Sequence, residues 1–415
     1  MRSTFTAMTV VLLSGLAATA APAAQKAEAA ATPAAQSDLC PGNLSNGARK
    51  PLIDLKAAVD AKDAAAYATA HAAARAAAKK PDDRCILAQL ELSNAANASN
   101  FTAASAAVDA LQASGVANTS RLTTIINNIG KNQYNGKDYA GATQSFEKAI
   151  KLAPNDPENY MLLAETKTKM GQSAAALGYY QKAAELGKAG GAKLSEDYLK
   201  RAVAVSYQSK SPQTADLARQ WVAAYPTSKN WRDAIKVYAD QSGIAPSELL
   251  DLWRLQRATK SLAGEGDYAR YALSATNKGL GGEAKAVLEE GFASNSISRS
   301  SSVISSLYKQ ASANLAGDRA SLGPAATKAL AGTAVKPLMT TADALYGYGD
   351  YAKAAELYRA AATKPGADVP LANLRLGAAL TMAGDKAGAK AALEAVTGPK
   401  AEQAKFWLVY LTQRP

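Results

Sequence analysis

The chain has 415 residues, 48% of them hydrophobic, and a formal net charge of +12, so it is long enough for several domains or one extended array of repeats. Its one histidine and two cysteines cannot build a Cys2His2 or three-histidine zinc site, and a Ser-His-Asp or Cys-His catalytic centre would need His71. The alanine-rich composition favours closely packed helices, and the positive charge, spread without runs of like charge, indicates a solvated basic surface.

Residues 1–24 have the layout of a secretory signal peptide. A polar start with Arg2 precedes an apolar stretch and then small residues with several A-x-A-like cleavage sites. The apolar stretch is about half the roughly 20 residues needed to cross a bilayer, so no membrane span is expected. Residues 25–39 are rich in alanine, lack an apolar stripe and are expected to form a disordered leader. The mature protein is therefore expected in the periplasm or outside the cell.

The two cysteines, Cys40 and Cys85, follow this leader. Exported proteins mature in an oxidising compartment, so we expect these cysteines to form a disulfide. The disulfide would close the loop between Cys40 and Cys85 and so reduce the entropy of the unfolded chain. This would stabilise the fold by on the order of 4 kcal/mol. The disulfide would attach the N-terminal segment to the first helices of region 40–120, which we interpret as N-terminal helical repeats.

The clearest signal lies in region 121–190, where one pattern occurs twice at a spacing of 34 residues. The first copy contains Ile126, Ile129, Gly130, Tyr139, Ala142, Phe146, Ala149 and Pro154, and the second contains Tyr160, Leu163, Ala164, Gly171, Ala176, Tyr180 and Ala183. Small residues such as Gly130 and Ala164 suit antiparallel helices that cross closely, while Phe146 and Tyr180 would fill the space between helix pairs. The pattern predicts two tandem helix pairs.

This pattern resembles the tetratricopeptide repeat (TPR), in which a large residue, Leu-Gly, Ala-x3-Phe and a closing proline recur. The resemblance implies an all-α fold, an α-solenoid of tandem antiparallel helix pairs wound into a right-handed superhelix. It also implies that the first helix of each pair lines the concave face.

Weaker copies continue toward the C-terminus. Region 191–320 carries divergent helical repeats whose interruptions are expected to bend or divide the solenoid. These interruptions are Pro212, Pro226, Pro246 and the serine-rich residues 294–306. Region 321–415 matches the second helix of a repeat at 350–361, and a nearly complete unit follows around Leu376. We interpret this region as C-terminal TPR-like repeats ending in a capping helix near 404–411.

Catalytic interpretations find little support. His71 has no acid or thiol nearby in the sequence, and glycine-rich residues 187–193 and 279–282 match neither phosphate-binding fingerprint, so helix ends explain them better. Glycan-cleaving enzymes can work with carboxylates alone, but the periplasmic lyases that carry a helical solenoid add a lysozyme-like domain, for which the repeats leave no room. We expect a protein that is not an enzyme and uses neither cofactor nor metal.

Export also argues against nucleic acid as a partner, and the tryptophans fall at core-like helical positions. These tryptophans are Trp221, Trp231, Trp253 and Trp407.

The concave face implied by the resemblance is the candidate site. Its predicted residues in the two strong repeats are Asn127, Asn128, Lys131, Tyr134, Asn135, Met161, Glu165, Thr168 and Lys169, with Leu162 beside them. Asparagine, lysine and tyrosine side chains can hydrogen-bond an extended peptide, and methionine and leucine can take apolar side chains. A merely solvated inner face is the plain alternative.

The sequence therefore predicts a non-catalytic protein- or peptide-binding scaffold in the periplasm or cell envelope of a Gram-negative bacterium, a host inferred from the signal peptide and the family. The alternative function is binding of an anionic envelope polymer, peptidoglycan or lipopolysaccharide, through the basic surface.

Overall fold

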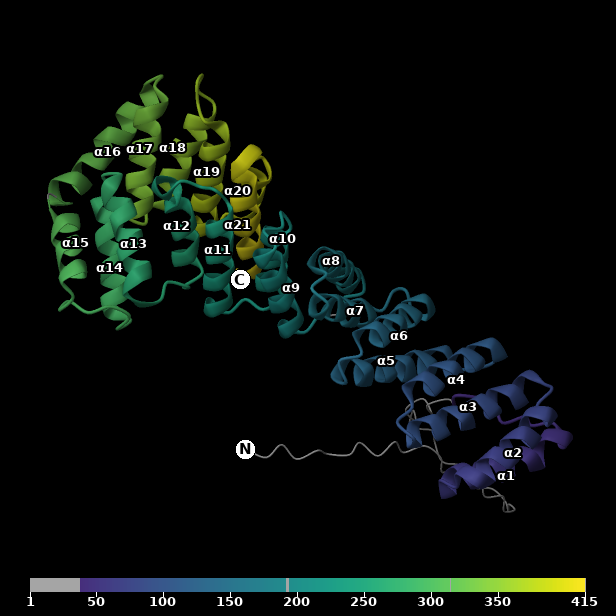
Figure 1. Cartoon of the computed structure of the whole chain (residues 1–415). Coiled ribbons are helices and arrows are strands. Elements are labelled where there is room, and N and C mark those ends of the chain that lie inside the picture. Colours follow the sequence, from purple (N-terminus) through teal and green to yellow (C-terminus); the bar gives the residue numbers. More distant parts are fainter. Residues whose placement is uncertain (1–37, 192–193, 314, 415) are drawn as a thin grey trace, which may run out of the picture.

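The computed structural model of the chain describes residues 38–191, 194–313 and 315–414. In these ranges the chain forms 21 α-helices and two short 3-10 helices, without a β-strand. Consecutive helices pack in pairs along most of the chain (Figure 1), which confirms the predicted all-α solenoid. The predicted signal peptide and nearly all of the predicted leader lie outside the described residues.

The first eight helices form an elongated N-terminal arm (Figure 1). They are α1 (Asn46–Ala61), α2 (Ala64–Ala77), α3 (Pro81–Asn97), α4 (Phe101–Ser114), α5 (Thr119–Asn135), α6 (Tyr139–Leu152), α7 (Pro157–Lys169) and α8 (Ser173–Ala189). The two helix pairs expected in region 121–190 are α5 with α6 and α7 with α8.

The remaining helices form a rounded C-terminal body (Figure 1). They are α9 (Glu196–Gln208), α10 (Thr214–Ala224), α11 (Ser228–Gln241), η1 (Pro246–Glu248), α12 (Leu250–Ala258), α13 (Gly264–Asn277), α14 (Gly281–Ala293), α15 (Ser302–Ser312), α16 (Leu315–Ala331), α17 (Val335–Gly347), α18 (Tyr351–Ala362), α19 (Val369–Ala383), α20 (Lys386–Glu394), η2 (Gly398–Lys400) and α21 (Ala401–Gln413).

As predicted, a small residue on one helix of a pair lies against a large residue on the other helix. Phe146 is 1% exposed, and a Cβ atom at Gly130 would lie 2.5 Å from its ring. The same relation recurs in the C-terminal body, where a Cβ atom at Gly377 would lie 2.4 Å from Leu393. Because a larger residue would push the two helices apart, these glycines set how closely the pairs pack.

Short turns between the helices of a pair also follow a common design. Asp138, Asp350 and Asp385 each cap the second helix by accepting a backbone N–H through the carboxylate. The residue before each aspartate has a positive φ: Gly349 and Gly384 satisfy this without strain, whereas Lys137 adopts φ 66°.

The predicted disulfide between Cys40 and Cys85 is present, with a Cα–Cα distance of 5.7 Å. Leu39, the last residue of the predicted leader, is buried, and its carbonyl oxygen accepts a hydrogen bond from the Asn118 N–H at 2.8 Å. The buried carboxylate of Asp83 accepts hydrogen bonds from the backbone N–H and the hydroxyl of Ser45. The segment before α1 is therefore attached to α3 and to the start of α5.

Helix α21 does more than cap the last repeat. It packs against α19 and α20 as expected, but it also lies against α10. Glu402 forms an ion pair with Arg219, the Gln413 amide donates to the Val222 carbonyl at 2.8 Å, and the Tyr410 hydroxyl donates to the Ala258 carbonyl at 2.7 Å. The C-terminal body therefore closes on itself, and this closure was not anticipated from the repeat pattern.

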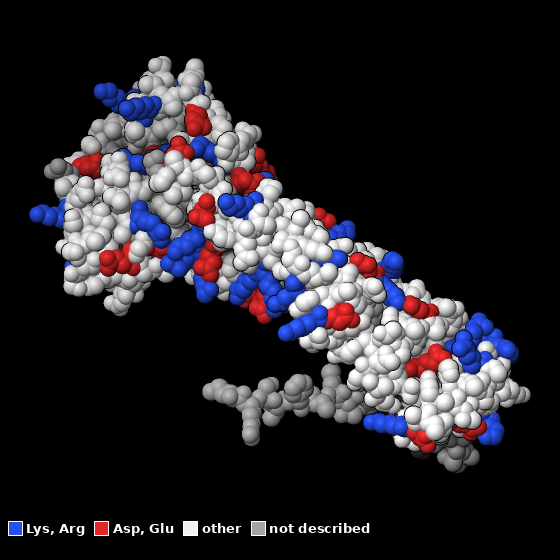
Figure 2. Space-filling model, in the orientation of Figure 1, with Lys and Arg blue, Asp and Glu red and all other residues white. Residues whose placement is uncertain are grey.

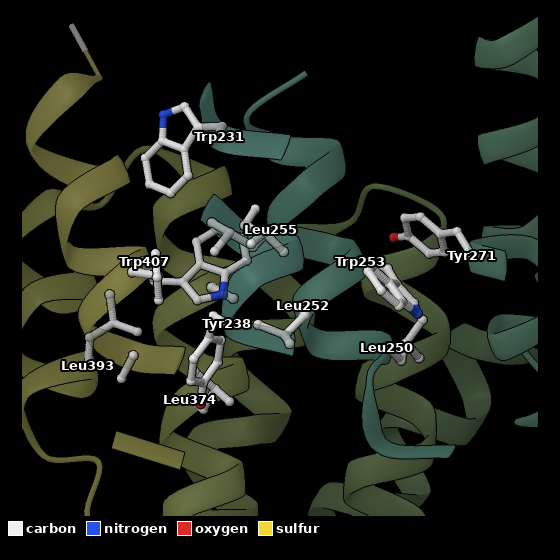
Figure 3. Packing of buried hydrophobic residues seen from close by; sticks show 14 of the residues in the cluster. Trp231, Tyr238, Leu250, Leu252, Trp253, Leu255, Tyr271, Leu374, Leu393 and Trp407 are labelled. Atoms are coloured by element: carbon white, nitrogen blue, oxygen red, sulfur yellow. The ribbon is translucent and has the colours of Figure 1, made fainter. Parts of the chain in front are cut away.

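Helix α12 fills the interior of this closed body. Its residues from Leu250 to Gln256 are all buried, and Figure 3 shows Leu250, Leu252, Trp253 and Leu255 among side chains from α11, α13, α19, α20 and α21. All four tryptophans are buried, as predicted. A helix that is buried on every face is a core element, not part of a surface repeat.

Two charged residues of α12, Asp251 and Arg254, are neutralised inside the body. The Arg254 guanidinium donates to Glu283 at 2.7 and 2.9 Å and to Asp343 at 3.0 Å. Arg375 binds Asp251 at 2.9 and 3.1 Å and Asp343 at 2.8 Å. We call these five residues the core ion network; it connects α12 to α14, α17 and α19.

Candidate functional site

A pocket of about 260 Å³ opens on the N-terminal arm between α5 and α7. Its lining residues are Lys131, Tyr134, Asn135, Phe146, Leu162 and Glu165. Phe146 and Leu162 are buried and provide an apolar wall, while the other four are at least partly exposed. Those four are among the nine residues predicted from the sequence. We call this cavity the arm pocket.

Helix periodicity explains why these residues meet. Lys131, Tyr134 and Asn135 are three and four residues apart near the end of α5, and such residues share one face of a helix. Glu165 occupies on α7 the position that Lys131 occupies on α5, one 34-residue repeat earlier. Adjacent first helices therefore present neighbouring surfaces.

Two predicted groove residues are buried and do not lie on the open surface. Asn127 is 7% exposed, and its amide donates to the Asn159 side chain at 2.7 Å. Asn159 in turn donates to the carbonyls of Ala149 and Ala153. Met161, one repeat after Asn127, is 6% exposed. Asn127 therefore joins α5 to α7 through Asn159 instead of facing the groove, and Met161 is buried at the equivalent position of α7.

The other predicted residues stand near the arm pocket without lining it. Asn128 and Lys169 are exposed. Thr168 is partly buried, and its hydroxyl donates to the Ala164 carbonyl at 2.9 Å. The side chains of Asn128 and Lys169 therefore lie at the surface of the arm outside the pocket itself.

Ion pairs neutralise the charged residues around the arm pocket. Lys131 pairs with Glu158 at 2.8 Å, and Glu165 pairs with Arg201 from α9. Burial raises the pKa of Glu165 above its ordinary value, and Arg201 acts in the opposite direction. The immediate surroundings of the pocket therefore carry no large excess of one charge.

Tyrosines surround the same region. Tyr134 contacts Tyr139 edge to face, with 5.6 Å between ring centroids. The Arg201 guanidinium lies 5.8 Å from the Tyr198 ring centroid. Burial raises the pKa values of Tyr180 and Tyr198 to about 12, so both hydroxyls stay protonated at neutral pH.

The sequence prediction missed Tyr198 and Arg201. Arg201 lies 36 residues after its partner Glu165, so a strict 34-residue period does not align them. Counting helices instead of residues would have found this neighbour, because α9 is the next first helix after α7.

The structure also gives His71 a partner that its sequence neighbourhood lacks. Its Nε2 atom lies 2.6 Å from a carboxylate oxygen of Glu91 on α3, and its ring stacks on Tyr67 with 5.3 Å between centroids. The described residues contain no group of three or more His, Cys, Asp or Glu side chains placed to hold a metal ion. Nor does any described helix have the length and apolar character needed to cross a membrane.

No protein-family model matches the chain, and no curated protein matches it. The solved structures that are similar over most of this chain include the following two. One, "Structure of Naa15/Naa10 bound to HypK-THB", is 18% identical with a TM-score of 0.24, covering 86% of this chain and 64% of that one, so this chain spans less than two thirds of its length. The other, a circular tandem repeat protein with novel repeat topology, is 11% identical with a TM-score of 0.14, covering 88% and 84%. TM-scores this low do not support a fold assignment by similarity. The fold is therefore described from the helices of this chain alone.

Proposed function

We propose that this chain is a TPR-like, non-catalytic scaffold that binds an extended peptide segment of a protein partner on the concave face of the N-terminal arm. The observation that carries the proposal is the arm pocket, which combines an apolar wall with a polar rim. Peptide grooves of helical repeat proteins need both: a cavity for an apolar side chain and polar groups for the peptide backbone.

The rim offers both kinds of hydrogen-bonding group. Asn135 can donate and accept, Tyr134 can do the same through its hydroxyl, and Lys131 adds donors. Because Lys131 and Glu165 are already paired with Glu158 and Arg201, a peptide with an apolar anchor and little net charge suits this surface best.

The arm is a better binding surface than the C-terminal body for a steric reason. Helix α12 already occupies the interior of the body and is held there by the core ion network. A partner could enter that interior only by displacing a buried helix. The first helices of the arm need no such rearrangement.

We place the protein in the periplasm or outside a Gram-negative cell. The signal-like residues 1–24 and the disulfide between Cys40 and Cys85 support this location. We propose no catalytic role, cofactor or nucleic-acid partner, in keeping with the sequence analysis.

Binding of an anionic envelope polymer through the basic surface is the alternative function. Figure 2 shows Lys and Arg side chains interspersed with Asp and Glu over the visible face, without a broad area of one sign. Multivalent polymer binding draws on such an area, and it weakens steeply with salt. On this face, the mixed charges favour the peptide proposal over the polymer.

The test begins with a displayed library of random peptides, from which binders of the mature protein are selected. Tyr134→Ala and Asn135→Ala should each weaken the selected peptide about tenfold, the equivalent of roughly 1.4 kcal/mol, because each removes a contact at the rim. Asn135→Ala should keep the wild-type melting temperature because Asn135 is exposed. Tyr134→Ala should lower it, because Tyr134 also packs against Phe146 and Tyr139, so the Asn135 variant separates binding from stability. Lys151→Ala, an exposed change on α6, is the control.

Two results would contradict the peptide proposal. One is a set of rim variants that bind selected peptides like the wild type. The other is affinity for purified peptidoglycan or lipopolysaccharide that collapses between low and moderate salt while no peptide is selected, a result that would favour the polymer alternative.

A further inference from the structure

A buried carboxylate in the C-terminal body is surrounded by three cations. Asp267, in the first turn of α13, has a side chain only 1% exposed. Arg232 Nε lies 2.5 Å from one of its oxygens, and Arg270 Nη2 and Lys236 Nζ lie 2.7 and 3.3 Å from the other. The three cationic groups therefore meet around the same two oxygens. We call Arg232, Lys236 and Arg270 the cation triad.

The cation triad carries more charge than its partner neutralises. Three positive charges against one carboxylate leave a local excess of two. Asp233 also acts on Arg232, but it is itself paired with Lys229 at 2.9 Å. Glu265, near the start of α13, accepts a hydrogen bond from the Ser301 hydroxyl. In the described part of the chain, neither Asp233 nor Glu265 forms a hydrogen bond or ion pair with the triad, so Asp267 is the only carboxylate in direct contact with the three cations.

The cations are accessible while the carboxylate is not. The side chains of Arg232, Lys236 and Arg270 are 30%, 34% and 54% exposed. Although burial acts to raise the pKa of Asp267, hydrogen bonds from Arg232 and from the Ala263 N–H hold that pKa below its ordinary value. Asp267 therefore stays ionised and keeps the three cations in place at neutral pH.

Backbone contacts further orient the two guanidinium groups. Arg270 Nε donates to the Gly266 carbonyl at 3.0 Å, and Arg232 Nη2 approaches the Ala263 carbonyl at 3.4 Å. Within the described part of the chain, the Nη1 groups of both arginines have no hydrogen-bond acceptor, and Lys236 Nζ has only Asp267. Several N–H donors thus remain available on side chains that are already ordered.

We propose that the cation triad is a binding site for an oxyanion, the phosphate or carboxylate group of a ligand or partner molecule. Charge-assisted hydrogen bonds from guanidinium and ammonium groups are the strongest that a protein offers to such groups. Asp267 holds the cations together before the ligand arrives, so little side-chain freedom is lost on binding. The site belongs to α11 and α13, apart from the arm pocket, and does not depend on the proposed peptide function.

The experiment is isothermal titration of the mature protein with pyrophosphate and, separately, with citrate, at constant ionic strength. We expect saturable binding at one site for at least one probe, and the tighter probe distinguishes a phosphate from a carboxylate source. Arg270→Gln should weaken binding at least about tenfold, and Arg270→Lys should recover part of it. Lys278→Gln is the matched control, since Lys278 is an exposed cation at the opposite end of α13 from Asp267.

The absence of saturable binding by both probes would overturn the proposal. So would an equal loss in Arg270→Gln and Lys278→Gln, which would indicate general surface charge. Circular dichroism checks that each variant is folded, and Lys236→Gln, with the same expected loss, replaces Arg270→Gln if that variant does not fold. Tyr134→Ala should bind the probes normally, so failure here and failure of the peptide proposal can be told apart.

Discussion

At the scale of single residues, the stability of each helix pair depends on the residue that occupies the positive-φ position of its turn. Equivalent turns use Gly349 and Gly384 at positive φ, but the first strong repeat has Lys137 there at φ 66°. A side chain in this left-handed region costs on the order of 1 to 3 kcal/mol. The capping aspartate that follows, Asp138, is common to these turns, so the strain at Lys137 is local.

Lys137→Gly should therefore stabilise the protein. Relief of the strain outweighs the extra entropy of glycine in the unfolded chain, which is about 0.5 to 1 kcal/mol, and leaves a net gain of about 1 kcal/mol. Chemical denaturation would measure it. Lys137→Ala keeps a Cβ atom in the same backbone conformation and should change stability by no more than about 0.5 kcal/mol. A loss of stability in the glycine variant would contradict this interpretation of the turn.

Phe146 tests the packing of the repeat. It is 1% exposed and lies directly against Gly130, so Phe146→Ala should cost about 3 to 5 kcal/mol by leaving a cavity between the helices. Thermal or chemical unfolding would measure the loss. The exposed Lys151 on the same helix provides a comparison, and equal effects at both positions would mean that the helix pairs pack differently.

At the scale of helices, α12 shows how an element can leave the repeat and become a core. It follows Pro246 and the short helix η1, at one of the interruptions predicted to bend the solenoid. Its apolar residues pack against the surrounding helices (Figure 3), and its charges are met by Glu283, Asp343 and Arg375. The interruption thus supplies the helix that fills the body.

Removing one charge of the core ion network should be costly. Arg254→Met keeps the aliphatic stem but leaves Glu283 and Asp343 buried without that cation, and we expect a loss of about 3 to 5 kcal/mol. Arg257→Met on the same helix is the matched control, because its partner Glu290 is 51% exposed and such a pair contributes about 1 kcal/mol or less. Urea unfolding would measure the loss of stability in both variants. Similar losses would rule out a special role for the core ion network.

At the scale of the whole molecule, the arm and the body use the same helix pairs in different ways. In the arm each pair contacts mainly its neighbours, as in a linear solenoid. In the body, α21 contacts α10 through Arg219 and Glu402, which are 183 residues apart in the chain. One half is therefore a linear stack of helix pairs, and the other is a closed unit.

Deletion of residues 401–415 tests this division. Without α21, the sides of α10, α12 and α19 that it covers become exposed, so their amide hydrogens should exchange faster with solvent. Amides of α1–α6 should be unaffected, because stability in a linear solenoid passes mainly between neighbouring repeats. Hydrogen exchange followed by mass spectrometry would measure both. Unchanged protection of α12 would show that closure by α21 does not hold that helix in place.

The sequence by itself determined the features that depend on residues close together in the chain. The helix pairs, the contact of Gly130 with Phe146 and the disulfide of the only two cysteines follow from periodicity, residue size and cysteine count. Four residues of the arm pocket could also be placed, because helix periodicity and the 34-residue repeat bring Lys131 and Glu165 to equivalent positions. The burial of Asn127 and Met161 was not anticipated, since the repeat pattern alone does not say how deeply neighbouring first helices pack.

Only the tertiary structure decided the closure of the body, the burial of α12, the core ion network and the cation triad. These features join residues such as Arg219 and Glu402 or Asp251 and Arg375, which lie far apart in the chain. Whether distant turns of a solenoid meet depends on small rotations between successive helix pairs, and these accumulate along the chain. The repeat pattern in the sequence describes each helix pair but not the accumulated rotation. It therefore does not predict the contacts that close the C-terminal body.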